Sequence, residues 1–304
     1  MTVAAAVPDR KAHMDGFASA VMVFLTLVWG LNTVISKLAF GGFSPLAISF
    51  LRAALAMMIV YGWCRYRGIS IFERDGSLMA GSAVGALFGL EFVAIYGGLD
   101  FTSAARATLM TSTMPFFLMI GAHFVLGEHV TMPKLIGLVI AFAGVTVVFF
   151  DKLSLPSPDA IYGDLLCLLG GALWAATTLT IRMTKASTLS PEKLLLYQLA
   201  GAALVAIPLM PFSGPLFREV SLVPVASLIF QAAFVVSFTY VLWFWLIARY
   251  PATGLSSFMF LSPVFGVFFG GLLLSDPISF NLLLGLAMIA AGLVLVNAVR
   301  RKDA

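Results

Sequence analysis

The chain has 304 residues, of which 61% are hydrophobic and only 11% carry a charge, and its mean hydropathy is +1.04. Soluble domains carry about 25% charged residues, so this composition excludes a soluble globular protein and indicates a polytopic membrane protein. The formal net charge of +4 requires no nucleic-acid partner, because membrane proteins concentrate basic residues in the loops on one side of the bilayer.

Long windows without charge predict the membrane-spanning helices, since about 20 apolar residues cross the bilayer core as a helix. In chain order, the ten expected spans cover residues 16–37, 44–64, 76–98, 102–126, 131–150, 161–182, 191–212, 220–247, 251–275 and 277–299. The loops between them are too short for a soluble domain. Residues 1–15 are polar and have no cleavage site followed by a soluble domain, so we expect a cytoplasmic tail and an anchored first helix.

The distribution of lysine and arginine orients these spans. With the N-terminus in the cytoplasm, only Lys37, Lys152 and Arg218 fall in outside segments, whereas the inside segments hold most of the 18 basic residues. The positive-inside rule then places both termini in the cytoplasm.

A segment of the chain occurs twice, 148 residues apart. The sequence FVLGEHVTMPKLIGLVIAFAG (residues 124–144) matches LLLSDPISFNLLLGLAMIAAG (272–292) without a gap, and Pro115 matches Pro263 at the same offset. Paired proline, glycine and acidic positions distinguish this match from the chance likeness of two apolar helices.

The duplication divides the chain into two halves. Spans one to five, in residues 16–150, correspond to spans six to ten, in residues 161–300, and a periplasmic linker of residues 151–160 joins them. Because five is odd, the second copy enters the membrane from the opposite side. The sequence therefore predicts an all-α membrane protein built as two inverted five-helix repeats, in which a central site can open alternately to either face.

These residues resemble a known family. VWGLNTVISK, FLRAALAMMIV and TSAARATLMTSTMPFFLMIGAHFVLGEHVTMPKLIGLVIAFAGVTVV resemble the first EamA repeat of the drug/metabolite transporter superfamily, and LSSFMFLSPVFGVFFGGLLLSDPISFNLLLGLAMIAAGLVL resembles the second. Ser275 and Asp276 stand where that family usually has Gly-Glu. The tryptophan-rich centre is similar to the YddG-like exporters of aromatic amino acids. The resemblance implies a ten-helix exporter in the cell inner membrane, with a central cavity open to one side at a time.

Pro115 and Pro263 fall in the interiors of spans four and nine. Each proline removes a backbone hydrogen bond and kinks its helix, and such breaks tend to lie beside the central site of a transporter. A kink that serves packing alone is the alternative. Their equivalent positions in the two repeats lead us to predict a gating or kink role.

Two glycines, seven residues apart, share one helix face in each of spans five and ten. They are Gly137 and Gly144 in the first repeat, and Gly285 and Gly292 in the second. Small residues allow helix backbones to approach closely in lipid, so we expect these spans to be scaffold elements.

Aromatic and polar side chains recur at equivalent depths of the two repeats. Trp29 and Asn32 share one face of span one, and Trp174 and Thr177 repeat that face in span six. Asparagine in hydrocarbon is costly unless it has a partner or faces a cavity, and aromatic faces with a few polar tips suit a small amphipathic ligand. Core packing is the alternative. We predict that substrate is bound by Trp29, Asn32, Phe92, Tyr96, Trp174, Thr177, Tyr240 and Trp243.

Glu91, Arg52 and Arg106 are charged residues well inside predicted spans. Intramembrane ionisable residues serve function or pair with one another. The duplication does not preserve these charges, since Arg52 matches Gln198 and Glu91 matches Thr239. Substrate contact, a role in coupling and an Arg–Glu ion pair are all open for Glu91 and Arg52.

The sequence contains no constellation of catalytic residues and no GxxxxGK[ST] phosphate loop, so we expect no enzyme activity, no cofactor, and secondary or facilitated transport. Cys64 and Cys167 lie in different spans and predict no disulfide. We also expect no metal site, because His13, His123 and His129 have no third ligand in sight.

The deep residues are aromatic, whereas an anionic cargo would require several buried Lys or Arg. A neutral amino acid, aromatic or of medium size, fits this set best, with broad specificity. Export of lipophilic or quaternary cations is the alternative, because aromatic faces also bind cations and Glu91 could supply a counter-charge. The expected partners are the small-molecule substrate and the lipid bilayer, and we expect a monomer.

Overall fold

The structure is a computed structural model that describes residues 11–73, 75–99, 101–212, 214–274 and 279–298. In these residues the regular structure is helical, apart from one isolated β-bridge between Phe43 and Phe217. Ten helical segments are long and apolar enough to cross a membrane, which confirms the ten predicted spans. The predicted limits lie within about three residues of the observed ones, except that positions 275, 277 and 299 fall outside the described residues.

Most spans are continuous. The uninterrupted α-helices are α1 (Gly16–Ala39), α2 (Pro45–Arg67), α3 (Leu78–Leu99), α7 (Ala160–Met183) and α13 (Phe280–Ala298). Spans five and seven continue into short 3₁₀ turns: α6 (Met132–Phe149) into η1 (Phe150–Lys152), and α8 (Pro191–Ala206) into η3 (Ile207–Phe212). A further 3₁₀ turn, η2 (Lys185–Thr188), joins α7 to α8.

The other three spans are interrupted. Span four consists of α4 (Ala104–Thr111) and α5 (Met114–Leu126). Span eight consists of α9 (Leu222–Phe230), the π-helical η4 (Gln231–Thr239) and α10 (Tyr240–Arg249). Span nine consists of α11 (Ala252–Ser257), the 3₁₀ turn η5 (Phe258–Phe260) and α12 (Leu261–Leu274).

Serine and proline start the equivalent helices α2 and α8. The hydroxyl oxygens of Ser44 and Ser190 each accept the backbone N–H three residues further on, at 3.2 and 3.3 Å. Pro45 and Pro191 follow, where a fixed φ is pre-organised for the first helical turn and the missing N–H costs nothing. At the other end of α2, Gly68 adopts φ 67° and terminates the helix in the left-handed region.

The helices form two compact units, and each unit contains parts of both repeats. Among the described residues, unit 1 comprises those within 35–93 and 180–249, and unit 2 comprises those within 11–34, 94–179 and 250–298. Helix α1 passes from unit 2 to unit 1 after residue 34, and α7 does so after residue 179. These positions are 179 − 34 = 145 residues apart, which is also the spacing of Trp29 and Trp174. The division into units therefore follows the duplication.

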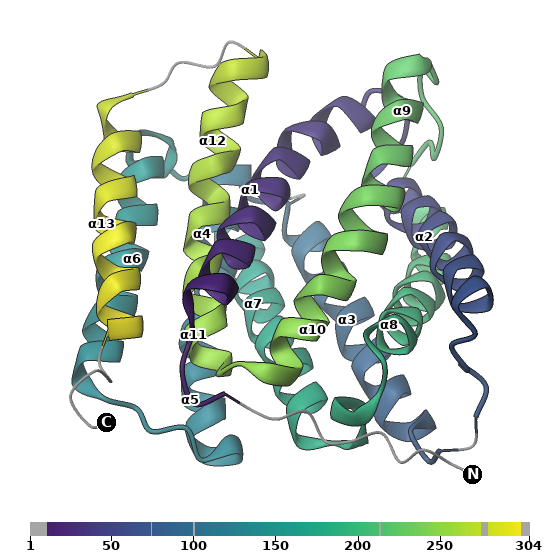
Figure 1. Cartoon of the computed structure of the whole chain (residues 1–304). Coiled ribbons are helices and arrows are strands. Elements are labelled where there is room, and N and C mark those ends of the chain that lie inside the picture. Colours follow the sequence, from purple (N-terminus) through teal and green to yellow (C-terminus); the bar gives the residue numbers. More distant parts are fainter. Residues whose placement is uncertain (1–10, 74, 100, 213, 275–278, 299–304) are drawn as a thin grey trace. The chain divides into compact units, whose positions relative to one another are not determined.

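In unit 2, α6 and α13 lie side by side (Figure 1). A Cβ atom on Gly137 would lie 2.7 Å from the carbonyl oxygen of Gly292, and one on Gly144 would lie 2.8 Å from that of Gly285. Residue numbers rise along one helix as they fall along the other, so the two helices are antiparallel. Equivalent helices of the two copies thus run in opposite directions, as an inverted repeat requires. Glycine permits the close backbone approach that the sequence predicted.

In unit 1, α3 packs against α8 through three glycines that the sequence analysis did not single out. Gly81, Gly85 and Gly89 are four residues apart and share one helix face. A Cβ atom on Gly81 or Gly85 would collide with Tyr197, and one on Gly89 would lie 2.6 Å from Cγ2 of Val205. This close contact fixes the direction in which α3 presents its aromatic and charged side chains.

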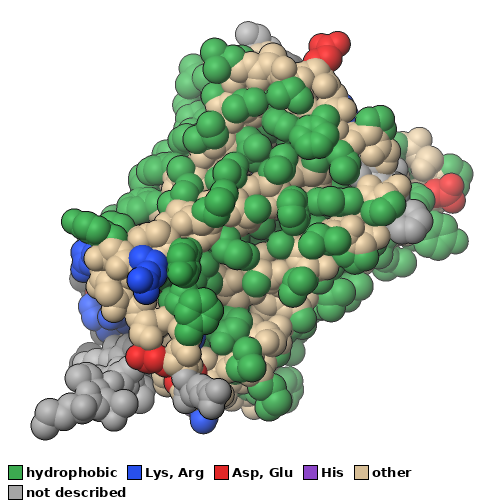
Figure 2. Space-filling view, turned by 90° about the vertical axis from the view of Figure 1, so that its right-hand side faces the viewer, with side chains coloured by type: hydrophobic (Ala, Val, Ile, Leu, Met, Phe, Trp, Pro, Cys, Tyr) green, Lys and Arg blue, Asp and Glu red, His purple; other side chains and the backbone are tan. Residues whose placement is uncertain are grey.

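Hydrophobic side chains dominate the surface shown in Figure 2, and the visible charged side chains are confined to its ends. Large apolar residues are exposed along the helices; Phe124, Leu204 and Val294 have 80%, 70% and 67% of their surface accessible. Exposure of so much apolar surface to water is unfavourable. The lipid tails of a bilayer are themselves apolar and cover it without a free-energy cost.

Candidate functional site

The structure divides the residues predicted to act in transport between the two units. Unit 1 holds Arg52, Glu91, Phe92, Tyr240 and Trp243. Unit 2 holds Trp29, Asn32, Tyr96, Pro115, Trp174, Thr177 and Pro263.

A continuous chain of aromatic rings runs through unit 1 and ends on an arginine. The guanidinium carbon of Arg52 lies 5.2 Å from the ring centroid of Phe92. Phe92 meets Phe88 edge to face at 4.9 Å, Phe88 meets Tyr240 at 6.3 Å, and Tyr240 meets Phe244 at 6.4 Å. These are favourable cation–π and edge-to-face geometries. The chain joins three of the predicted site residues and adds Phe88, which the spacing of one helical turn before Phe92 could have revealed.

Two charged side chains are buried beside this aromatic chain. Arg52 has 9% and Glu91 has 5% of its surface accessible. In the described part of the chain, no ion pair of 4.0 Å or less joins them, and Oε2 of Glu91 has no hydrogen-bond partner. The structure therefore contains a buried cation and a buried carboxyl group that do not neutralise one another directly.

The π-helical segment η4 interrupts span eight in the same unit. Its first residue, Gln231, is fully buried, and its side-chain oxygen accepts a hydrogen bond from the Ser36 hydroxyl at 3.3 Å. Its amide nitrogen Nε2 is buried with no acceptor among the described residues. π-helical turns are frequent at functional sites, and no pattern in the sequence signalled this one.

In unit 2, both predicted prolines lie just after a helix break. Pro115 is the second residue of α5, and Pro263 follows the 3₁₀ turn η5 as the third residue of α12. Rings beside the two breaks meet: Phe116 lies 6.3 Å from Phe260, and Phe142 of α6 contacts both, at 5.6 and 6.4 Å. The structure thus brings the two breaks to one aromatic cluster, which spacing in the sequence could not show.

The helices that carry the predicted tryptophans pack against these breaks. On α1, a Cβ atom at Gly30 would lie 2.8 Å from the carbonyl oxygen of Ser262, directly before the proline in span nine. On α7, a Cβ atom at Gly171 would lie 3.1 Å from the carbonyl oxygen of Thr111, at the break in span four. Each tryptophan-bearing helix therefore contacts the broken helix of the other repeat.

The two polar members of the unit 2 set differ in the hydrogen bonds they can still make. The Thr177 hydroxyl is 2% accessible and donates to the carbonyl oxygen of Leu173 at 2.9 Å, so it can only accept a bond from a ligand. Oδ1 of Asn32 is buried without a hydrogen-bond partner among the described residues. Asn32 thus has an unused acceptor, whose burial is costly unless a ligand or water meets it.

Arg106, the third charge inside a predicted span, has a structural partner. Its guanidinium forms a two-pronged ion pair with Asp164 of α7, and it donates to the carbonyl oxygen of Leu153 at 2.6 Å. Thr102 adds a hydrogen bond of 2.7 Å to the same carboxylate. Asp164 could not be recognised from the sequence as this partner, because its position near a span end gives no sign of a buried ion pair.

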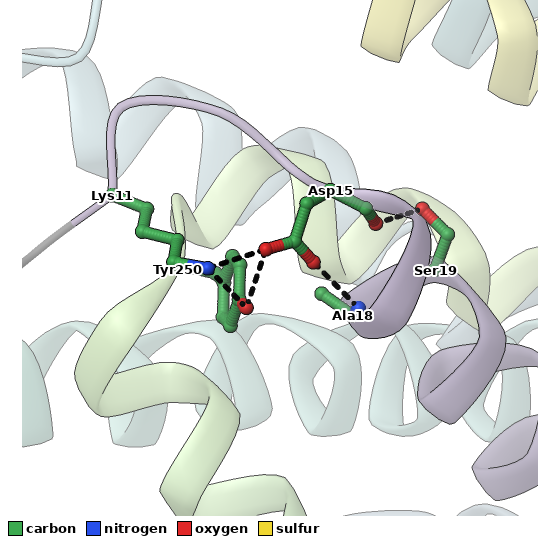
Figure 3. A network of polar contacts seen from close by, with 5 residues as sticks. All are labelled: Lys11, Asp15, Ala18, Ser19 and Tyr250. Atoms are coloured by element: carbon green, nitrogen blue, oxygen red, sulfur yellow. Dashed lines mark hydrogen bonds and ion pairs between the residues drawn. The ribbon is translucent and has the colours of Figure 1, made fainter.

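A similar cluster fastens the start of α1 (Figure 3). The Tyr250 hydroxyl donates to Asp15 at 2.9 Å, and Lys11 pairs with the same carboxylate at 2.5 Å. The hydrogen bond from Lys11, then that from the backbone N–H of Ala18, lower the pKa of Asp15 to about 2. Tyr250 and Thr102 are 148 residues apart, the offset of the repeat, but Asp15 and Asp164 are 149 apart on helices offset by 145, so the two clusters use carboxylates at different positions.

Glu128 of the first repeat caps a helix of the second. Its carboxylate accepts the backbone N–H groups of Ala252 and Thr253 at 2.9 and 3.3 Å, and the Thr253 hydroxyl at 2.8 Å. A carboxylate at a helix N-terminus satisfies orphan donors and favours the helix dipole. Its repeat counterpart, Asp276, lies outside the described residues.

The described residues contain no group of three or more His, Cys, Asp and Glu side chains that could hold a metal ion.

A model of the EamA-like transporter family matches residues 17–150 and 161–298. The chain belongs to this family. Membership confirms the predicted drug/metabolite transporter superfamily, and this EamA-like protein is a multi-pass membrane transporter, not an enzyme.

Curated relatives match this EamA-like protein along nearly their whole length. The uncharacterized transporter YoaV of Bacillus subtilis is 24% identical over 273 residues, covering 90% of this chain and 94% of the relative. Proteins described as probable amino-acid metabolite efflux pumps are 26% identical in Salmonella typhimurium and 25% in Escherichia coli, each covering 93% of this chain and 94% of the relative. A crystal structure of 18% identity superposes with a TM-score of 0.81, over 96% of this chain and 100% of that one, which shows the shared fold.

Proposed function

We propose that this transporter exports neutral amino acids, aromatic ones included, across the inner membrane with broad specificity. The observation that carries the proposal is the aromatic chain of unit 1, in which Phe92, Phe88 and Tyr240 offer adjoining apolar faces next to Arg52. The relatives described as amino-acid metabolite efflux pumps support the same substrate class. Transport works by alternating access, because inverted repeats allow one central site to open to either face in turn.

The residues proposed to hold the substrate are Trp29, Asn32, Phe92, Tyr96, Trp174, Thr177, Tyr240 and Trp243. Aromatic faces bind an apolar side chain through surface burial, worth about 25 cal/mol per Å². Oδ1 of Asn32 and the Thr177 hydroxyl each offer an acceptor to a polar group of the substrate. Such contacts tolerate many side chains, which accounts for the broad specificity. Pro115 and Pro263 provide the flexible points at which spans four and nine bend when the central site opens to one face or the other.

Uptake into liposomes that contain only the purified protein tests this function. Labelled phenylalanine, tryptophan, threonine and methionine are compared with a lipophilic dication. Amino-acid flux should fall at least tenfold when Trp174 or Tyr240 is replaced by alanine, since losing about 60 Å² of apolar contact already costs about 1.4 kcal/mol, and an aromatic side chain can bury more than that. Trp63→Ala is the matched control, because Trp63 is 47% accessible near the end of α2. Equal losses in the control would refute the proposed site.

The same assay decides the alternative function. Aromatic faces next to a buried carboxyl group, Glu91, also suit a lipophilic cation. Flux of the dication without any amino-acid flux would establish multidrug export and reject the amino-acid proposal.

We also propose that both termini lie in the cytoplasm. Cysteine labelling from outside the cell should then reach position 159 in the loop between α6 and α7, and should fail at Lys185 between α7 and α8. Labelling of Lys185 from outside would reverse the orientation and the direction of export.

A further inference from the structure

Arg52 and Glu91 lie at the same level of unit 1. Helix α2 starts and α3 ends on the same membrane face, because consecutive spans are antiparallel. Arg52 is 52 − 45 = 7 residues from the start of α2, and Glu91 is 99 − 91 = 8 residues from the end of α3. At 1.5 Å per residue, their depths from that face are about 10 and 12 Å. The contact of Arg52 with the ring of Phe92, which directly follows Glu91, brings the two levels together.

Neither Arg52 nor Glu91 has an oppositely charged partner in the described part of the chain. Each residue is at least nine-tenths buried, and a buried charge is stable only when it is paired or hydrogen-bonded. The Phe92 ring attracts the guanidinium of Arg52 but offers it no hydrogen-bond acceptor. Oε2 of Glu91 has no hydrogen-bond partner, and no ion pair joins it to Arg52, in the part of the chain that the structure describes.

A third group of the same level is an unused donor. Gln231 is 231 − 222 = 9 residues into span eight, which starts on that same face, and its helix segment η4 packs against α2. Its side-chain oxygen accepts a hydrogen bond from the Ser36 hydroxyl, but its Nε2 is buried without an acceptor among the described residues. One level of unit 1 therefore carries a cation on α2, an amide donor on the η4 segment that packs against α2, and a carboxyl group on α3.

We propose that these groups select the two charged ends of a free α-amino acid: Arg52 and Gln231 receive the carboxylate, and Glu91 receives the ammonium group. This inference rests on the proposed function and assigns the residues that would recognise each end of its amino-acid substrate. The two ends of a zwitterion are separated by a single carbon, so one ligand neutralises both buried charges at once. Charge-assisted hydrogen bonds of this kind are the strong ones.

The two repeats differ in charge at these positions, and this difference gives the bound ligand a single orientation. The positions equivalent to Arg52 and Glu91 hold Gln198 and Thr239, which carry no charge. A symmetrical site would accept the ligand in two opposed directions. With charges in the first repeat only, the zwitterion binds one way, and its side chain is directed by the aromatic rings on α3 and α10.

Three ligands that share one side chain test the inference on the unaltered protein. In the liposome assay, unlabelled phenylalanine, 2-phenylethylamine, which lacks the carboxylate, and 3-phenylpropionate, which lacks the ammonium group, compete with labelled phenylalanine. We expect each incomplete ligand to compete at least tenfold more weakly, since a site built for a charged group rejects a ligand that lacks it. Equal competition by all three would overturn the inference and leave amino-acid export intact, whereas no phenylalanine flux at all would refute the proposed function itself.

Two variants test which residue binds which charged end of the ligand. Arg52→Gln should weaken phenylalanine competition about tenfold and abolish the disadvantage of 2-phenylethylamine. Glu91→Gln should also weaken phenylalanine competition about tenfold, and it should abolish the disadvantage of 3-phenylpropionate. Arg67→Gln, at the exposed end of the helix that carries Arg52, is the matched control. A uniform loss for all three ligands, or loss of pH-gradient dependence in Glu91→Gln with the ligand ranking unchanged, would refute the inference. If Arg52→Gln does not fold, Arg52→Lys keeps the charge and should keep the ranking.

Discussion

Replacing Gly137 by alanine perturbs the contact between α6 and α13 at one of its four close glycine positions. The new Cβ atom would lie 2.7 Å from the carbonyl oxygen of Gly292, and 2.7 and 2.9 Å from Cγ2 and the backbone nitrogen of Val296. Ordinary contacts begin near 3.4 Å, and two of these three atoms belong to the backbone, so no rotamer change relieves the clash. Overpacking costs about 1–3 kcal/mol, while alanine gains about 1 kcal/mol of helix propensity over glycine. We expect a net destabilisation of up to about 2 kcal/mol.

Thermal unfolding in one detergent measures the effect against a matched control. Gly62 lies within α2, and a Cβ atom there would have nothing within 4 Å, so Gly62→Ala should leave stability unchanged or raise it by about 1 kcal/mol. The double variant Gly137→Ala/Gly292→Ala should cost less than the sum of the single changes, because the first change already separates the helices. If Gly137→Ala unfolds at or above the temperature of the Gly62 control, the described packing is wrong.

Three further outcomes follow from the described contacts. Pro115→Ala and Pro263→Ala should leave the protein folded but slow transport, because a continuous helix hinges less easily; unchanged rates in both would reduce the prolines to packing details. Asp164→Asn should destabilise the fold by about 3 kcal/mol in thermal unfolding, since it leaves the largely buried Arg106 guanidinium without its carboxylate, and an unchanged unfolding temperature would contradict this. The pKa of Asp15, lowered from 3.8 to about 2, means that its stabilisation is present above pH 4 and is lost as the pH falls towards 2. Asp15→Asn should remove that component of the acid transition, and identical transitions in both proteins would show that the Asp15 cluster does not stabilise the fold.

In unit 2, the starts of the equivalent helices α1 and α7 are each held by a hydroxyl–carboxylate contact. Thr102 with Asp164, and Tyr250 with Asp15, place a hydroxyl on a carboxylate at the start of α7 and of α1, which are equivalent helices. A threonine and a tyrosine share no pattern that a sequence comparison would match.

Hydrophobicity determined most of the fold in advance. A segment without charge must bury its own backbone hydrogen bonds in lipid, and only a helix of about 20 residues does so. The number and limits of the spans could therefore be read locally. The odd number of spans per repeat then required inversion, and the spacing of Gly137 and Gly144 predicted a close helix contact.

The tertiary structure decided which distant side chains meet. Whether Arg106 pairs with Glu91 or with Asp164, or whether Arg52 lies on Phe92, depends on helix rotation and crossing, which residue spacing within one helix does not define. The π-helical segment at Gln231 likewise has no local signal. Sequence fixes a side chain's face and depth on its own helix, but pairing across helices follows from packing, and it was packing that left Arg52 and Glu91 at one level without an ion pair between them.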